Sequence, residues 1–108
     1  MKILVLTDTD ACCGPMAAAF LRDYSTTNEV VSAGRNPSGS MDAMVVTVMR
    51  ECLIDLSGYR PRKASDIDLP DFDVVYDCPE MSCDDSIDAY REMRDFIKNE
   101  AYLFFRGL

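Results

Sequence analysis

Three short runs of mostly apolar residues predict β-strands. They are Lys2–Leu6, Glu29–Ser32 and Phe72–Tyr76. The first run holds four consecutive apolar residues and then turns acidic. That pattern is typical of a buried strand in a parallel sheet and not of a signal peptide. We therefore expect three strands, the first of them central to the core.

Two stretches between these runs show the periodicity of helices. The first, Met16–Tyr24, is rich in alanine, and Pro15 before it suits the first turn of a helix. From Met41 onward, apolar residues recur three and four positions apart. This spacing predicts an amphipathic helix, which we expect to end at Ser57-Gly58.

A third periodic stretch predicts a long C-terminal helix. Its apolar positions run from Ile87 to Phe104. Ser82, followed by Asp85 three residues later, resembles a capping box at its start. We therefore expect the chain to end in a helix.

The order of these elements predicts a single α/β domain over residues 1–108. Strands that alternate with helices form a parallel sheet through right-handed crossovers, with helices on both faces in a three-layer sandwich. In such folds ligands bind beyond the carboxyl ends of the strands. Two loops therefore become candidate sites, Thr7–Gly14 and Asp77–Asp85.

Composition narrows the classes of function. The 108 residues include 19 acidic and 11 basic ones, for a net charge of −8, and no histidine. A surface with this much negative charge repels nucleic acid and anionic lipid. We therefore expect neither a nucleic acid nor a membrane as a partner. The absence of histidine removes the commonest general base and the commonest metal ligand. Five cysteines without a leader segment are typical of reduced thiols, and we expect a cytoplasmic protein.

Several segments match one known family in the same order along the chain. They are Pro15–Arg22, Ser32–Gly34, Ile54–Arg62, Asp66–Val75 and Asp88–Asp95. Together they resemble the low-molecular-weight protein tyrosine phosphatases and the related arsenate reductases. The resemblance implies the phosphotyrosine protein phosphatase I-like fold and directs attention to the family's phosphate-binding loop.

That loop departs from the family pattern at its two reactive positions. The family has a cysteine, five further residues and an arginine, followed by Ser or Thr and then Pro. Aligned on Pro15, the nucleophile's position holds Thr7 and the arginine's position holds Cys13. A thiolate attacks phosphorus and a guanidinium clamps two oxygens, so both chemical functions are missing. The hydroxyl of Thr7 has a pKa far above that of a thiol, and the chain has no histidine to activate it.

The other loop positions are altered in part. Asp10 replaces the bracing asparagine and Gly14 replaces the Ser or Thr, whereas Cys12 keeps the family's second cysteine. Asp8 and Asp10 bring negative charge to the place where a phosphate would bind. By the resemblance, Thr9, Ala11 and Gly14 are the positions that would contact a ligand. We predict a pseudo-phosphatase that acts as a binding or regulatory module, with an unknown protein or small molecule as partner.

The C-terminal part also departs from the family. The family's general acid lies in an Asp-Pro pair before the last helix, and this region reads Glu80-Met-Ser-Cys-Asp-Asp85. Only a few residues separate the third strand from it, so about one strand and one helix are missing. The shortened sheet would leave an edge through which two copies could pair as a homodimer.

Two alternatives remain open for the altered loop. Asp8 and Asp10 directly after a strand resemble the haloacid dehalogenase-like phosphatases, and with Asp77 they could bind Mg²⁺. Two-component receiver domains carry their phosphoacceptor aspartate on a strand similar to Phe72–Tyr76, with Asp77 at the matching position. Those domains need two further strands after this point, and the rest of this chain is predicted to form one helix.

Cysteine redox chemistry is the second alternative. Cys12 and Cys13 come just before a helix, and the arsenate reductases of this fold use cysteines in relay. Adjacent cysteines rarely pair, so Cys78 or Cys83 would be the expected partner of either one.

Overall fold

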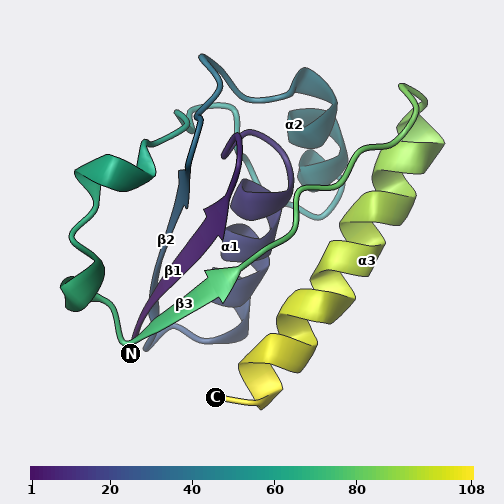
Figure 1. Cartoon of the computed structure of the whole chain (residues 1–108). Helices are drawn as coiled ribbons and strands as arrows, with labels where there is room; N and C mark the ends of the chain where they lie inside the picture. The colour runs from purple at the N-terminus through teal and green to yellow at the C-terminus, as the bar shows by residue number, and fades with distance from the viewer.

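The computed structural model describes the whole chain, residues 1–108. Its strands and α-helices are, in order, β1 (Lys2–Thr7), α1 (Cys13–Tyr24), β2 (Glu29–Gly34), α2 (Ala43–Arg50), β3 (Val74–Asp77) and α3 (Ile87–Arg106). Two single-turn 3-10 helices, η1 (Ala64–Asp66) and η2 (Leu69–Asp71), lie between α2 and β3 (Figure 1). The predicted alternation of strands and helices is confirmed.

The three strands form one parallel sheet in the order β2-β1-β3. In its centre, Val5 of β1 lies opposite Ser32 of β2 and Tyr76 of β3. The expected short sheet is confirmed, because no fourth strand covers the outer edge of β3. The carboxyl ends of β1 and β3 lie side by side, which brings the two candidate loops to one edge.

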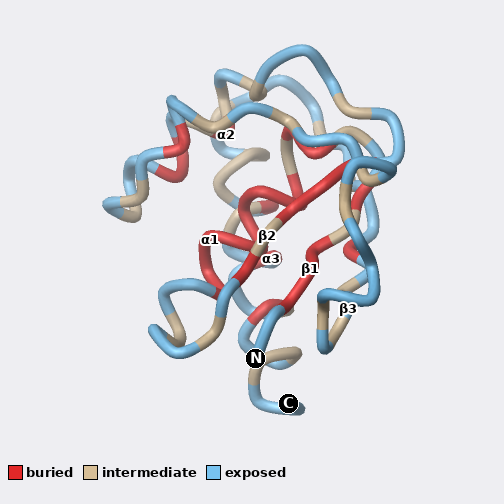
Figure 2. Tube along the Cα trace, turned by 90° about the vertical axis from the view of Figure 1, so that its left-hand side faces the viewer, coloured by how far each residue is buried: buried red, intermediate tan, exposed pale blue.

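Helices α1 and α3 cover one face of the sheet, and the segment with η1 and η2 passes the other (Figure 1). The second outer layer is therefore thin, although the three-layer order is as predicted. The core lies between β1, α1 and α3, where Val5, Met16 and Ile97 are among the buried residues. Figure 2 shows that burial is concentrated in β1 and α1. None of the helices is both long and apolar enough to cross a membrane.

Helix α2 is much shorter than the periodicity predicted. It ends at Arg50 and not at Ser57-Gly58. Leu53 has a φ of 63°, in the left-handed region, and the N–H of Ile54 donates to the carbonyl of Met49 at 3.1 Å. This arrangement closes a helix, so the apolar residues that follow lie outside it.

Helix α3 does not begin with the predicted capping box. Ser82 and Asp85 lie in the irregular segment before it, and Ser86 is the N-cap. The Ser86 hydroxyl accepts the N–H of Ala89 at 3.1 Å. The prediction was wrong because Ser86 is itself a good N-cap and lies directly before the first helical residue.

Candidate functional site

The interior of the loop between β1 and α1 is filled by the side chain of Thr7. Thr7 is fully buried, and its Oγ1 accepts the backbone N–H of Asp10 at 3.3 Å. A Cβ on Gly14 would lie 2.6 Å from the same oxygen, so only glycine fits there without a shift. The Thr7 hydroxyl, which the resemblance aligns with the family's nucleophile, is therefore packed inside the loop and does not face solvent.

Asp10 braces the loop from behind. It is fully buried, with a φ of 52°, and its Oδ2 accepts the Tyr59 hydroxyl and the backbone N–H of Arg62, the latter at 2.8 Å. Its Oδ1 has no hydrogen-bond partner. Burial raises the pKa of this carboxyl, and the hydrogen bonds only partly oppose that effect. Asp10 thus joins the loop to the segment after α2 and is not placed to meet a substrate.

Cys13, which the resemblance aligns with the family's arginine, lies in the core. It is fully buried, and its Sγ accepts the backbone N–H of Met81 at 3.3 Å. This contact ties the first turn of α1 to the segment between β3 and α3. A thiol with no exposed surface cannot take the part of a guanidinium that grips an anion.

Cys12 is half-buried and lies next to Cys13, with 4.0 Å between the two sulfur atoms. Its pKa is raised by the hydrogen bond with Cys13, by burial and by the nearby carboxylates of Asp42 and Glu80. Cys12 therefore stays protonated at neutral pH, whereas a nucleophilic cysteine needs the thiolate.

A pocket of about 470 Å³ opens beside this loop. Four segments form its wall: the loop after β1, residues 38–42 before α2, residues 80–83 after β3, and α3. Both loops that the sequence pointed to contribute. Thr9, Ala11 and Cys12 line the pocket, but Gly14 does not, because it packs on Thr7.

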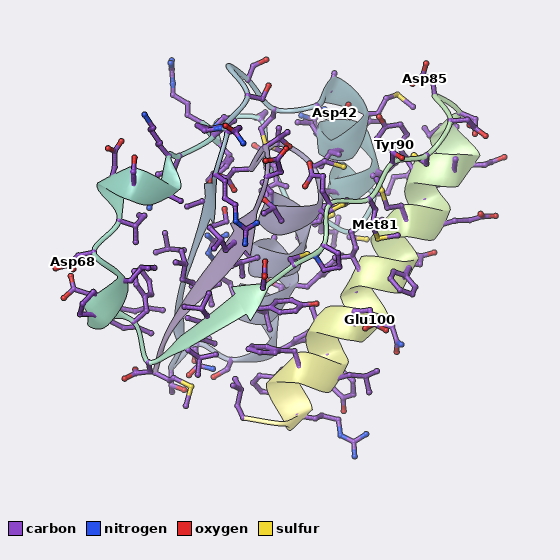
Figure 3. The ribbon with its side chains drawn as sticks, in the orientation of Figure 1. Asp42, Asp68, Met81, Asp85, Tyr90 and Glu100 are labelled. Carbon is purple, nitrogen blue, oxygen red and sulfur yellow. The ribbon has the colours of Figure 1, made fainter.

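The wall of the pocket is acidic. The Tyr90 hydroxyl donates to Asp42 Oδ2 at 2.6 Å, and the Thr9 hydroxyl donates to Glu80 at 2.5 Å. Figure 3 shows Asp42 above Tyr90, with Met81 close by, in the gap between α2 and α3. No lysine or arginine lines the pocket. Two carboxylates without a basic neighbour favour a cationic ligand over an anionic one.

The carboxylates of the predicted magnesium site are not brought together. Asp8 accepts the side-chain amide of Asn36 at 2.9 Å, Asp77 forms a salt bridge with Arg35 at 2.9 Å, and Asp10 is held behind the loop. No three Cys, Asp or Glu side chains in the chain converge closely enough to ligate an ion. The predicted Mg²⁺ site therefore lacks a set of ligands that could hold the ion.

The cysteines expected to form a redox pair fall into two groups. Cys13 and Cys78 are buried in the core, where burial and nearby charges raise the pKa of Cys78 to about 12. Cys12 and Cys83 are half-buried and line the same pocket. All five thiols are free.

Comparison with known families agrees with this fold. The model of the low-molecular-weight phosphotyrosine protein phosphatases matches residues 2–102. The chain belongs to this family. This member of the phosphatase family has Thr7 at the end of β1 and Cys13 at the start of α1, on either side of the loop that joins them. No curated protein sequence matches it significantly.

Solved structures similar to this family member share its fold at low sequence identity. An arsenate reductase from Archaeoglobus fulgidus is 18% identical, with a TM-score of 0.81, covering 96% of this chain and 98% of the other. The low-molecular-weight tyrosine phosphatase from T. tengcongensis is 18% identical, with a TM-score of 0.84 and coverage of 100% and 99%. Wzb from Vibrio vulnificus, solved with benzylphosphonate, is 19% identical, with a TM-score of 0.78 and coverage of 99% and 98%.

Sequence reasoning missed the part of the pocket that comes from residues 38–42 and from α3. Asp42 was recognisable in principle, because an aspartate directly before a periodic apolar stretch is a common N-cap. It does cap α2, through the N–H of Met44 at 2.9 Å. Its contact with Tyr90 spans 48 positions and had no local signal.

Proposed function

We propose that this chain is a non-catalytic member of the phosphatase family that binds a ligand or partner in the acidic pocket beside the altered loop. The single observation that carries the proposal is the burial of both reactive positions. Thr7 and Cys13 are fully buried, and each is held by a backbone N–H, of Asp10 and Met81 respectively.

Electrostatics support the same conclusion. A phosphate dianion in this pocket would meet the carboxylates of Asp42 and Glu80 with no basic side chain in the wall. At the effective dielectric of a partly buried site, such like-charge contacts cost several kcal/mol. A protein or small molecule that presents a positive group suits the pocket better.

The test is turnover of an aryl phosphate such as p-nitrophenyl phosphate, with and without Mg²⁺. We expect no turnover above the rate without protein under either condition. Cys12→Ser and Asp8→Asn are the informative variants, because both side chains are at least partly exposed. Metal-independent turnover that is lost in Cys12→Ser would contradict the proposal. Metal-dependent turnover lost in Asp8→Asn would instead favour the chemistry of the Asp8 and Asp10 pair.

A cysteine-based redox role is the second candidate, because Cys12 and Cys83 line one pocket. Hydrogen peroxide would oxidise the two thiols to a disulfide and be reduced to water. The number of free thiols, counted under denaturing conditions, would then fall by two in the wild type and not in Cys83→Ser. An unchanged count after mild oxidation would exclude this candidate.

Location and assembly complete the proposal. Five free cysteines are typical of proteins in reducing compartments, which supports a cytoplasmic location. The unpaired edge of β3 supports a homodimer.

A further inference from the structure

Two thiols are in contact where helix α1 begins. Cys12 is the N-cap of α1 and Cys13 is its first residue. Their sulfur atoms lie 4.0 Å apart, in the one hydrogen bond that joins two cysteines of this chain. We propose that this pair is a peroxide-reactive dithiol, which closes to a disulfide and thereby changes the wall of the acidic pocket. The second part of the inference rests on the proposed function, because it concerns the same pocket.

The two thiols differ in their access to the pocket. Cys12 is half-buried, lines the pocket and makes no capping hydrogen bond with its side chain. Cys13 is fully buried and does not line the pocket. A small peroxide that enters the pocket therefore meets Cys12 first, and Cys13 is the thiol next to it.

The surroundings of Cys13 suit it to assist the reaction of Cys12. The hydrogen bond with Cys12 lowers the pKa of Cys13, burial opposes this effect, and the backbone N–H of Met81 adds to it. A lower pKa raises the fraction of Cys13 that is thiolate. Its sulfur is therefore placed to take the proton of Cys12 as Cys12 attacks, in the way that an adjacent base activates a nucleophile.

The oxidation balances with hydrogen peroxide as the oxidant. The Cys12 sulfur attacks one peroxide oxygen, its proton passes to the Cys13 sulfur, and the O–O bond breaks. The hydroxide that leaves takes a proton from solvent and becomes the first water. The Cys13 sulfur then attacks the sulfenic acid of Cys12, the S–O bond breaks, and the departing hydroxide takes the Cys13 proton as the second water. Two sulfurs are oxidised to one disulfide, and one peroxide is reduced to two waters.

Closure of the disulfide removes an anchor of the pocket wall. The Cys13 sulfur accepts the backbone N–H of Met81 at 3.3 Å and lies 3.8 Å from the Met81 carbonyl oxygen. Met81 belongs to the segment between β3 and α3, which forms no helix or strand. The two cysteine sulfurs must approach from 4.0 Å to about 2 Å to bond, so the contact with Met81 is broken.

Strain makes this disulfide suitable for reversible oxidation. Neighbouring Cα atoms are about 3.8 Å apart, closer than the roughly 4.4–6.8 Å of ordinary disulfides. Strained disulfides are easily reduced, and labile or regulatory disulfides are often of this kind. For the same reason the sequence favoured Cys78 or Cys83 as a partner, but the structure places the two adjacent sulfurs in contact.

The experiment is peptide mapping of the reduced wild type after treatment with one equivalent of hydrogen peroxide. Free thiols are alkylated with iodoacetamide under denaturing conditions, and the protein is digested with trypsin without reduction. Cleavage after Lys2 and Arg22 releases Cys12 and Cys13 in one peptide that holds no other cysteine. We expect this peptide to carry no alkyl group and to be lighter by two hydrogen atoms, while the other three cysteines stay alkylated.

Two variants identify the partner of Cys12. Cys83→Ser is the matched control, because Cys83 also lines the pocket, and its peptide map should change as in the wild type. Cys13→Ser should form no disulfide. A disulfide that links the Cys12 peptide to the Cys83 peptide or to a second chain would overturn the inference. Full alkylation of Cys12 and Cys13 in the treated wild type would also overturn it, and that result needs no variant.

Amide hydrogen exchange tests the effect on the pocket. Oxidation should remove the protection of the Met81 amide, whereas the amides of the central strand β1 should stay protected. Unchanged protection of Met81 in the disulfide form would overturn the link to the pocket. The aryl phosphate assay on the reduced protein separates this inference from the proposed function. Turnover removes the non-catalytic function, whereas a missing disulfide without turnover removes only the dithiol.

Discussion

At the scale of single residues, the contact between Thr7 and Gly14 decides what the loop can do. Thr7 occupies the loop interior, and Gly14 leaves room for it. The two residues stand at positions where the family resemblance places a cysteine and a Ser or Thr. The two replacements therefore depend on each other. Because the Thr7 side chain turns inward, position 14 has no room for a Cβ, and only glycine fits there without a shift.

This contact predicts that Gly14→Ala is destabilising although Gly14 lies in helix α1. Alanine normally gains about 0.5–1 kcal/mol over glycine inside a helix. Here its Cβ would lie 2.6 Å from Thr7 Oγ1, and overpacking costs about 1–3 kcal/mol. We expect a net loss of about 1 kcal/mol in the free energy of unfolding, measured by urea denaturation.

Two further variants test the cause. Thr7→Ala should remove the clash, so Gly14→Ala in that background should be neutral or stabilising. Gly58→Ala is the matched control, because a Cβ at Gly58 would meet nothing within 4 Å. If Gly14→Ala is as mild as Gly58→Ala, the packing of Thr7 against Gly14 is not as described.

At the scale of elements, the start of α3 separates the observed cap from the predicted one. Ser86→Ala removes the hydroxyl that accepts the N–H of Ala89 and should lower the free energy of unfolding by about 1 kcal/mol. Ser82→Ala changes a residue outside the helix and should stay within about 0.5 kcal/mol of the wild type. Thermal or urea unfolding of both variants provides the comparison. Equal effects would contradict the observed helix start.

The packing of α2 against α3 includes a charged network with a defined pH dependence. Glu51, directly after α2, accepts hydrogen bonds from Arg91 and Arg94 of α3. These hydrogen bonds lower the pKa of Glu51 to about 2, and the bond from Arg91 has the larger effect. Because the pKa is lower in the folded state, the stabilisation is present above the ordinary pKa of glutamate, near 4.5, and is lost as the pH falls toward 2.

Glu51→Gln should therefore be less stable than the wild type at neutral pH, and the difference should shrink as the pH falls below about 4.5. Urea denaturation of both proteins at several pH values measures it. Glu92→Gln is a suitable control, because Glu92 is exposed on α3 and forms no salt bridge. A constant difference between Glu51→Gln and the wild type across the pH range would show that the network does not act through the charge of Glu51.

At the scale of the whole molecule, the free edge of β3 is the surface through which we propose that two copies pair. Antiparallel pairing of two copies centred on Val75 would place Asp73 of one copy opposite Asp77 of the other. Like charges directly opposite each other are destabilising, and each copy carries a net charge of −8. We therefore expect the dimer to strengthen with ionic strength, because salt screens this repulsion.

Light scattering after size exclusion, at low and at high salt, measures this effect. Val75→Lys should abolish the dimer without unfolding the chain, because the Val75 side chain is 45% exposed. A monomer at every salt concentration, or a dimer unaffected by Val75→Lys, would contradict pairing through this edge.

Much of the fold was predictable because its signals are local. The apolar run at Lys2–Leu6 and the spacing of apolar residues in α3 each lie within one element. The boundaries of α2 were not predictable in the same way. Its periodic pattern continues past Arg50, but the left-handed backbone at Leu53 ends the helix.

The sequence by itself determined the element order, the parallel sheet and the place of the two loops that follow β1 and β3. Only the tertiary structure decided that Thr7 turns inward, that Cys13 faces Met81, and that Asp42 meets Tyr90 across a sulfur-rich pocket. The physical reason is the range of the interactions. Periodicity and turn chemistry act over a few neighbouring residues, whereas the direction of a side chain in the site depends on segments that packing brings together from distant parts of the chain.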